Sequence, residues 1–196
     1  MGRSSVEQAL QNRARIVEEA SRLFRERGVE AVSVSDIMAA AGMTVGGFYK
    51  HFASKEVLVR EACALSFEQA AQVWQKLTSD RPEAGAIVEH YFRERPAHQT
   101  CPVLAFAPHV SAADTAHPAR EAYSRGVEAL LSGFLSQIGT SEHSEIPEEA
   151  QILFAAMIGA QLLAQASDNA DWATALQQAV SRRARKQTHA DERTSA

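Results

Sequence analysis

Apolar side chains recur every three or four residues along nearly the whole 196-residue sequence, and no stretch shows the alternation of a half-buried strand. The pattern predicts an all-α protein of about nine helices. One predicted helix, Glu148 to Ala166, is apolar on nearly every side, so it must be buried on more than one face. A short apolar helix that begins at Pro102 is predicted to break or end at Pro108, which has no backbone N–H.

Gly46 and Gly47 are adjacent in a short predicted helix, on the side opposite to the apolar residues Val45, Phe48 and Phe52. Each glycine should cost the helix about 1 kcal/mol relative to alanine. Packing on an outward face does not require glycine. The missing side chain does, however, let a partner approach the backbone closely.

Hydrogen-bond donors surround this bare face. Tyr49 and His51 lie beside it, and Lys55 follows Ser54, which is predicted to cap the next, long helix. A cation in the first turn of a helix is unfavourable unless an anion docks there. A short helix with a bare face and neighbouring donors suits a DNA groove bordered by phosphates.

The preceding residues predict a second short helix joined to the first by a tight turn. Ser33 and Asp36 have the spacing of a capping box, and Gly42 ends the helix that they open. Thr44 then caps the glycine-bearing helix, which is the layout of a helix-turn-helix. A generic helical hairpin would give the same layout, but the paired glycines and the donors favour DNA binding.

Three segments carry a more specific pattern: Ala20-x2-Leu23-Phe24-x3-Gly28, Val34-x2-Ile37-x2-Ala40-Ala41-Gly42, and Thr44-Val45-Gly46-Gly47-Phe48-Tyr49-Lys50-His51-Phe52-x2-Lys55-x2-Leu58. With them, residues from about Ile16 to Ala62 resemble the DNA-binding domain of the tetracycline-repressor (TetR) family of bacterial regulators. The resemblance implies that Tyr49, His51 and Lys55 hold phosphates, whereas Thr44 to Gly47 and Lys50 meet the groove. Since glycine offers no side chain for base readout, specificity is expected from Thr44, Val45, Lys50 and DNA shape. The DNA-binding residues expected are Ser33, Ser35, Thr44, Val45, Gly46, Gly47, Tyr49, Lys50, His51 and Lys55.

The charge distribution agrees with a DNA-binding N-terminal third. Residues 1–60 hold nine Lys or Arg and seven Asp or Glu, a net charge of +2, whereas residues 61–196 hold eleven and seventeen, a net charge of −6. The sequence has neither a membrane-spanning run nor a signal-peptide core, and its two cysteines suit a reducing compartment. We therefore expect a cytoplasmic protein with no membrane partner.

The sequence predicts three parts: a helix-turn-helix domain at residues 1–53, a helical body for effector binding and dimerisation at residues 54–186, and a disordered tail at residues 187–196. The resemblance implies a homodimer on operator DNA that is released when a small molecule binds. The expected effector pocket, suited to an apolar or aromatic molecule, comprises Trp74, Tyr91, Phe92, Cys101, Phe106, His109, Tyr123, Phe134, Met157 and Gln161. The expected dimerisation residues are Phe154, Met157, Ile158, Gln161, Leu162, Trp172 and Leu176.

The most favoured function is a ligand-responsive transcriptional regulator, more readily a repressor than an activator. Two alternatives stay open. Cys101 precedes Pro102 at a predicted helix start, where a thiol gains thiolate character, so it could sense electrophiles or oxidants. Alternatively, the chain is a helical small-molecule-binding protein or enzyme without specific DNA binding. No metal site, cofactor or catalytic residue is expected, because the sequence contains no matching motif.

Overall fold

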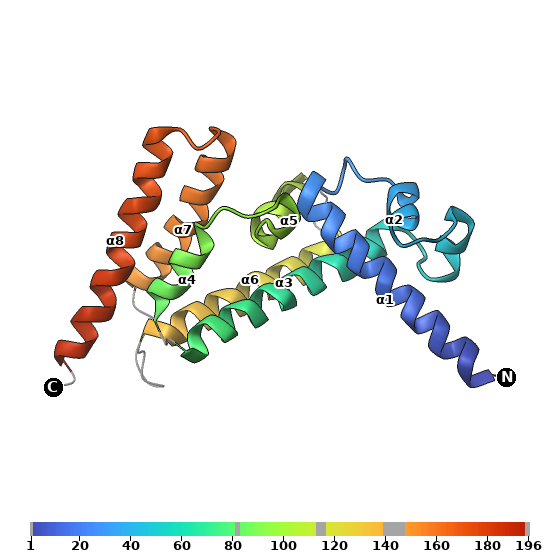
Figure 1. Cartoon of the computed structure of the whole chain (residues 1–196), viewed down its shortest axis with the longest axis horizontal. Coiled ribbons are helices and arrows are strands. Elements are labelled where there is room, and N and C mark those ends of the chain that lie inside the picture. The colour runs from blue at the N-terminus through green and yellow to red at the C-terminus, as the bar shows by residue number, and fades with distance from the viewer. Residues whose placement is uncertain (1, 81–82, 113–116, 139–147, 195–196) are drawn as a thin grey trace. The chain divides into compact units, whose positions relative to one another are not determined.

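The computed structural model describes residues 2–80, 83–112, 117–138 and 148–194, and every regular element in these ranges is a helix (Figure 1). The α-helices are α1 (Gly2–Arg27), α2 (Val34–Ala40), α3 (Lys55–Asp80), α4 (Ala84–Tyr91), α5 (Pro102–Ala112), α6 (Pro118–Leu135), α7 (Glu148–Ala166) and α8 (Asp171–Thr194). Three 3-10 helices, η1 (Val45–Lys50), η2 (Ala97–Gln99) and η3 (Ser136–Ile138), complete the list. The predicted all-α fold is confirmed, and the eight α-helices with η1 give nine helices in the described ranges.

Helix α5 corrects the predicted break at Pro108. The helix continues through this proline to Ala112. Proline removes only the hydrogen bond that residue 108 would donate to the carbonyl of Leu104. The side chains of Phe106 and Val110, on either side of the proline, are buried and keep the helix on the core. Tertiary packing therefore overrides the local helix-breaking tendency.

Two predicted segments have different bounds in the structure. Helix α8 extends to Thr194, whereas the sequence predicted a disordered tail from residue 187. The added residues include Ala, Glu, Arg and Gln, which favour helix, and contain neither glycine nor proline. The sequence Asp80-Arg81-Pro82 has the pattern of a helix start, and α4 begins shortly after it at Ala84. Arg81 and Pro82 themselves lie outside the described residues, as does most of the polar, acidic segment at residues 140–149.

Contacts divide the chain into two compact units. The first comprises Met1–Ala70 and Arg95–Val127, and the second comprises Ala71–Glu94 and Glu128–Ala196. Helices α3 and α6 each contribute residues to both units. This division therefore differs from the predicted boundary at residues 53 and 54, because α5 and the first part of α6 group with the N-terminal helices.

The first unit is held together around α1. Apolar residues of α1, among them Ile16, Ala20 and Phe24, are fully buried. The hydroxyl groups of Ser21 on α1 and Ser66 on α3 form a buried hydrogen bond of 2.7 Å, so neither polar group is left unsatisfied where the two helices meet.

The second unit consists of α4, α7 and α8 with the adjoining ends of α3 and α6. Helices α7 and α8 lie side by side, drawn in orange and red in Figure 1, and α4 packs against α8. The Trp74 ring lies 6.4 Å from the ring of Tyr91, 6.4 Å from that of Phe154 and 6.5 Å from that of Phe134, measured between centroids. Among the described residues, no helix is both long and apolar enough to cross a membrane.

The contact between Phe67 and Gly126 in the first unit leads to a stability prediction. A Cβ added to Gly126 would lie 2.2 Å from Cγ of Phe67, which is far inside van der Waals contact. Gly126→Ala should therefore lower the free energy of unfolding by about 1–3 kcal/mol, the usual cost of overpacking. Urea unfolding followed by circular dichroism measures this change.

Gly133, on the same helix, is the matched control. A Cβ there meets no atom within 4 Å, so Gly133→Ala should leave stability unchanged or raise it by up to about 1 kcal/mol. Equal effects of the two substitutions would show that the Phe67 contact does not limit the residue at position 126.

Candidate nucleic-acid interface

Helix α2 begins at the capping box that the sequence predicted. The Ser33 hydroxyl accepts a hydrogen bond of 3.1 Å from the backbone N–H of Asp36, and the Asp36 carboxylate accepts one of 2.8 Å from the backbone N–H of Ser33. Hydrogen bonds from the Ser33 side chain and backbone lower the pKa of the Asp36 carboxyl group. The cap thus fixes the start of α2 and already employs the Ser33 hydroxyl.

The turn between α2 and η1 depends on Gly42. Its φ of +71° lies in the left-handed region, which glycine occupies without a steric penalty. The backbone N–H of Met43 then donates to the carbonyl of Met38 over 2.8 Å, which closes the end of α2. Thr44 occupies the N-cap position of η1, but its hydroxyl makes no capping hydrogen bond.

The element that follows is a 3-10 helix rather than an α-helix. Its inner face is anchored by Phe48, which is fully buried and stacks on Phe52 with ring centroids 5.6 Å apart and planes at 28°. The Tyr49 ring meets Phe48 edge to face at 5.2 Å, while the residue remains 74% exposed. Two successive glycines weaken the preference for an α-helix, so packing of the phenylalanines holds the segment.

Neither glycine in η1 is required by the protein's own packing. A Cβ on Gly46 would meet no atom within 4 Å, and one on Gly47 would make only an ordinary contact of 3.6 Å with Cε of Met38. Both have negative φ angles, which any residue can adopt. Neither packing within the protein nor backbone conformation therefore explains why the backbone lacks side chains at these two positions.

Lys55, in the first turn of α3, makes a contact within the protein that the sequence did not predict. Lys55 Nζ donates a hydrogen bond of 2.8 Å to the carbonyl of Val29 in the loop after α1, and it lies 6.0 Å from the centre of the Phe24 ring. Lys55 thus joins α3 to the end of α1. An ammonium group carries three donors, so two remain for a phosphate.

Arg13 lies in the first half of α1, where an arginine could reach a phosphate, but its side chain is held within the protein. Its two terminal nitrogens each lie 2.6 Å from a carboxylate oxygen of Glu61, and its guanidinium stands 4.5 Å from the centre of the Phe52 ring. The Glu61 hydrogen bond raises the pKa of Arg13. This bidentate pair ties α1 to α3 behind η1.

The structure brings the predicted DNA-binding residues together in the first unit. Those that are exposed at its surface are Ser33, Ser35, Thr44, Val45, Gly46, Tyr49 and Lys50, and those that are half-buried are Gly47, His51 and Lys55. The exposed residues combine hydroxyls, a cation and bare backbone. Such a set can contact both phosphate oxygens and base edges.

The predicted effector-pocket residues fall into different units. Cys101, Phe106, His109 and Tyr123 belong to the first unit, and Trp74, Tyr91, Phe92, Phe134, Met157 and Gln161 belong to the second. In the first unit the Tyr123 hydroxyl donates to the Val103 carbonyl at 3.2 Å, and His109 Nδ1 lies 2.5 Å from a carboxylate oxygen of Glu30.

The His109 imidazole also contacts a second histidine that sequence analysis did not assign to a site. Its ring centroid lies 4.7 Å from that of His117, and burial, followed by the charge of His109, lowers the pKa of His117. Among the described residues, no three His, Cys, Asp or Glu side chains are grouped so that they could hold a metal ion.

The predicted dimerisation residues differ in exposure. Phe154 and Met157 are buried inside the second unit, Ile158 and Gln161 are half-buried, and Leu162, Trp172 and Leu176 are 52%, 54% and 41% exposed. Ile152 on α7, which is not among the predicted dimerisation residues, is also exposed at 59%. Large apolar side chains thus remain uncovered along α7 and the start of α8.

The two thiols lie in different environments. Cys63 on α3 is fully buried, and burial raises its pKa to about 12. Cys101 precedes α5 and is half-buried. It lies within electrostatic range of the Arg25 guanidinium, whose pKa is lowered by burial and raised by the Cys101 charge.

Comparison with known proteins identifies the N-terminal region. Residues 16–62 match the family model described as bacterial regulatory proteins, tetR family. The chain is 43% identical over 60 residues to the HTH-type transcriptional regulator TtgR of Pseudomonas putida; the match covers 31% of this chain and 29% of TtgR. The similarity in sequence is thus confined to less than a third of that relative.

Solved structures extend the comparison to the whole fold. A TetR-family transcriptional regulator from Cytophaga hutchinsonii superposes with a TM-score of 0.75 over 91% of this chain and 96% of its own, at 16% identity. The reduced form of NemR from Escherichia coli gives 0.69 over 87% and 96%, at 19% identity. At these identities the likeness concerns the fold.

The fold and the arrangement around η1 define a helix-turn-helix protein with a larger helical body. The family match within that helix-turn-helix is specific: residues 16–62 form a DNA-binding domain of the TetR family.

The environments of the two cysteines predict selective labelling. In the folded protein at neutral pH, N-ethylmaleimide should modify Cys101 and leave Cys63 intact, because Cys63 is buried and almost entirely protonated. In urea both should react. Mass spectrometry of peptides from the two reactions measures this, and labelling of Cys63 ahead of Cys101 would contradict the described burial.

Proposed function

We propose that this protein is a ligand-responsive transcriptional regulator, a repressor, that binds palindromic operator DNA as a homodimer in the cytoplasm. The observation that carries the proposal is the bare backbone of Gly46 and Gly47. Neither residue is needed for packing or for a special φ angle. An external partner that comes close to the backbone explains both glycines, and the floor of a DNA groove is such a partner.

The side chains around the glycines support a duplex rather than a small molecule. Thr44, Val45 and Lys50 are exposed along η1, and Tyr49 extends from it into solvent. We assign phosphate contacts to Tyr49, His51 and the remaining donors of Lys55. Base readout is left to Thr44, Val45 and Lys50, assisted by the shape of the groove.

One copy of η1, only six residues long, covers a few base pairs. Specific binding therefore requires two copies about 34 Å apart along one face of the duplex. The exposed apolar side chains of α7 and α8 support a dimer that buries these helices against those of a second chain.

The effector proposed is a small apolar or aromatic molecule bound in the body. The ring cluster around Trp74 supports this class of ligand, because aromatic side chains dominate its environment. Ligand binding would favour a state of the dimer in which the two copies of η1 no longer match the spacing of the groove.

A thiol switch is the second candidate for the signal. It is supported by the accessibility of Cys101 and by the neighbouring Arg25 guanidinium, which favours the thiolate. Under this alternative, alkylation of Cys101 releases the DNA, and Cys101→Ser still binds DNA but no longer responds.

The bare backbone at Gly46 predicts that a side chain added there weakens DNA binding without lowering stability. Gly46→Ala should preserve or raise the melting temperature, since its Cβ meets no protein atom, yet weaken operator binding by at least about tenfold, or 1.4 kcal/mol. Fluorescence anisotropy with labelled operator DNA and thermal melts measure the two effects.

Gly133→Ala provides the control, because a Cβ there also meets no atom and the residue lies on α6, outside the proposed DNA and dimer contacts. It should leave DNA affinity unchanged. Unaltered operator affinity in Gly46→Ala would remove the main support for the proposed interface.

The exposed apolar surface predicts the position of the dimer contact. Leu162→Glu should convert the dimer to monomers, because a charge would replace a 52% exposed leucine within a buried interface. Val6→Glu, at a 62% exposed position on α1, should leave the dimer intact. Sedimentation velocity distinguishes the outcomes, and a tight Leu162→Glu dimer would place the contact elsewhere.

A further inference from the structure

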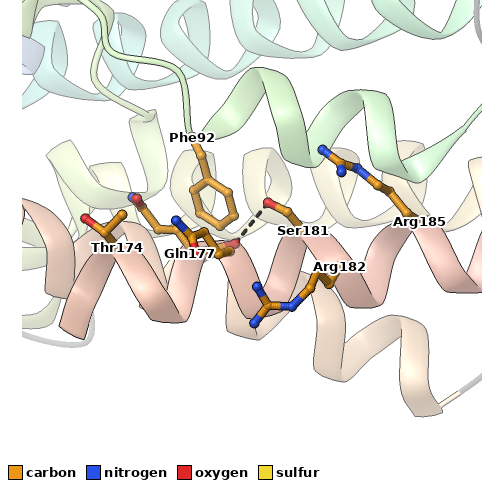
Figure 2. A pocket seen from close by; sticks show the side chains of 7 residues that line it. Phe92, Thr174, Gln177, Ser181, Arg182 and Arg185 are labelled. Carbon is orange, nitrogen blue, oxygen red and sulfur yellow. Dashed lines mark hydrogen bonds between the residues drawn. The ribbon is translucent and has the colours of Figure 1, made fainter. Parts of the chain in front are cut away.

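A groove on the second unit runs along α8 beside the end of α4 (Figure 2). Its volume is about 320 Å³, at the lower end of the range for small-molecule sites. Phe92 is also a residue of the predicted effector pocket, whereas the α8 residues of the groove belong neither to that pocket nor to the DNA interface or the predicted dimer contact. The residues used below are Phe92, Thr174, Gln177, Ser181, Arg182 and Arg185.

An aromatic ring occupies the centre of the groove. Phe92 is the C-cap residue of α4 and is half-buried, and its ring centroid lies 6.0 Å from that of Tyr91. Figure 2 shows the ring extending toward α8, near Gln177 and Ser181. The ring is thus held in place while part of its surface faces the groove, where a flat apolar molecule could stack on it.

Positive charge gathers at one end of the groove. Arg185 pairs with Glu89 over 3.0 Å. Among the side chains that the structure describes, which end at Arg185, no carboxylate lies within ion-pair distance of Arg182, so its charge is not balanced by them. A planar guanidinium matches the two oxygens of a carboxylate, which makes a carboxylate a better partner than a neutral group.

Neutral polar groups lie along the remainder of the groove. The Gln177 amide nitrogen donates to Gln161 at 2.9 Å and leaves its amide oxygen as an acceptor, while the Ser181 hydroxyl donates to the backbone carbonyl of Gln177. Thr174 lies at the end opposite to the arginines in Figure 2. These groups can orient a ligand, and among the groove residues none adds a negative charge that would repel an anion.

We propose that this groove binds an aromatic monocarboxylate, with the ring against Phe92 and the carboxylate on Arg182. The spacing of the groups is short enough for one small molecule: Gln177, Ser181 and Arg185 follow one another at helical intervals on one face of α8, and Arg182 flanks them. Binding here is independent of the proposed DNA binding.

The test uses 4-fluorobenzoate and the full-length protein without DNA, observed by fluorine NMR. A complex with a dissociation constant of about 1 mM or tighter is expected for a ligand of this size. Arg182→Gln should weaken it by about tenfold or more, since a charge-assisted hydrogen bond is lost. Arg183→Gln changes the next residue, which pairs with Glu149 outside the groove, and should leave binding unchanged.

Two further comparisons test the ring and the charge separately. Phe92→Leu, a milder change than alanine, should weaken binding while the thermal melt confirms folding. The uncharged analogue 4-fluorobenzamide should bind at least about tenfold more weakly than 4-fluorobenzoate. Three results would each overturn the proposal. They are no binding at a 4-fluorobenzoate concentration of about 10 mM, ten times the expected dissociation constant, equal affinity for 4-fluorobenzoate and 4-fluorobenzamide, and unchanged affinity in Arg182→Gln.

Discussion

The stacked pair of Phe48 and Phe52 is the contact on which the proposed DNA interface depends. Their rings bury the inner face of η1 and hold a six-residue helix that contains two glycines. Because packing of the inner face stabilises η1, the side chains of its outer face are not needed for folding. Gly46 and Gly47 can then remain without side chains, and the backbone is presented to solvent.

Charged side chains hold together the segments that support η1. Arg13 joins Glu61 of α3 and covers the Phe52 ring, and Lys55 reaches the carbonyl of Val29. These charged groups connect α1, the start of α3, the loop after α1 and the residues just after η1. A rigid arrangement of donors lowers the entropy lost when a duplex is bound.

Local sequence signals predicted the elements that are determined by their own residues. The capping box of Ser33 and Asp36 and the turn at Gly42 were recognised because caps and positive φ angles depend on residue type. The helix through Pro108 was missed because buried neighbours, distant in sequence, outweigh a local preference. The 3-10 geometry of η1 also depends on packing and was not predictable from periodicity.

Site residues follow the same division. The donors around η1 were predicted from their spacing, whereas the pairings of Arg13 and Lys55 join residues 48 and 26 positions apart and leave no trace in a local pattern. In the sequence alone, the arginines of α8 are explained as cations that complement the negative end of a helix. Their position beside Phe92 emerges once α4 is placed against α8.

The most direct test of the central claim is the affinity of the purified protein for its own upstream DNA and for scrambled DNA of equal length, measured across a salt series. The proposed interface predicts that the upstream DNA binds about 10³-fold more tightly or better, and that both affinities fall as salt rises. The proposal of a sequence-specific regulator would be contradicted if the upstream and the scrambled DNA bound equally weakly and if selection from random DNA also yielded no sequence that binds more tightly.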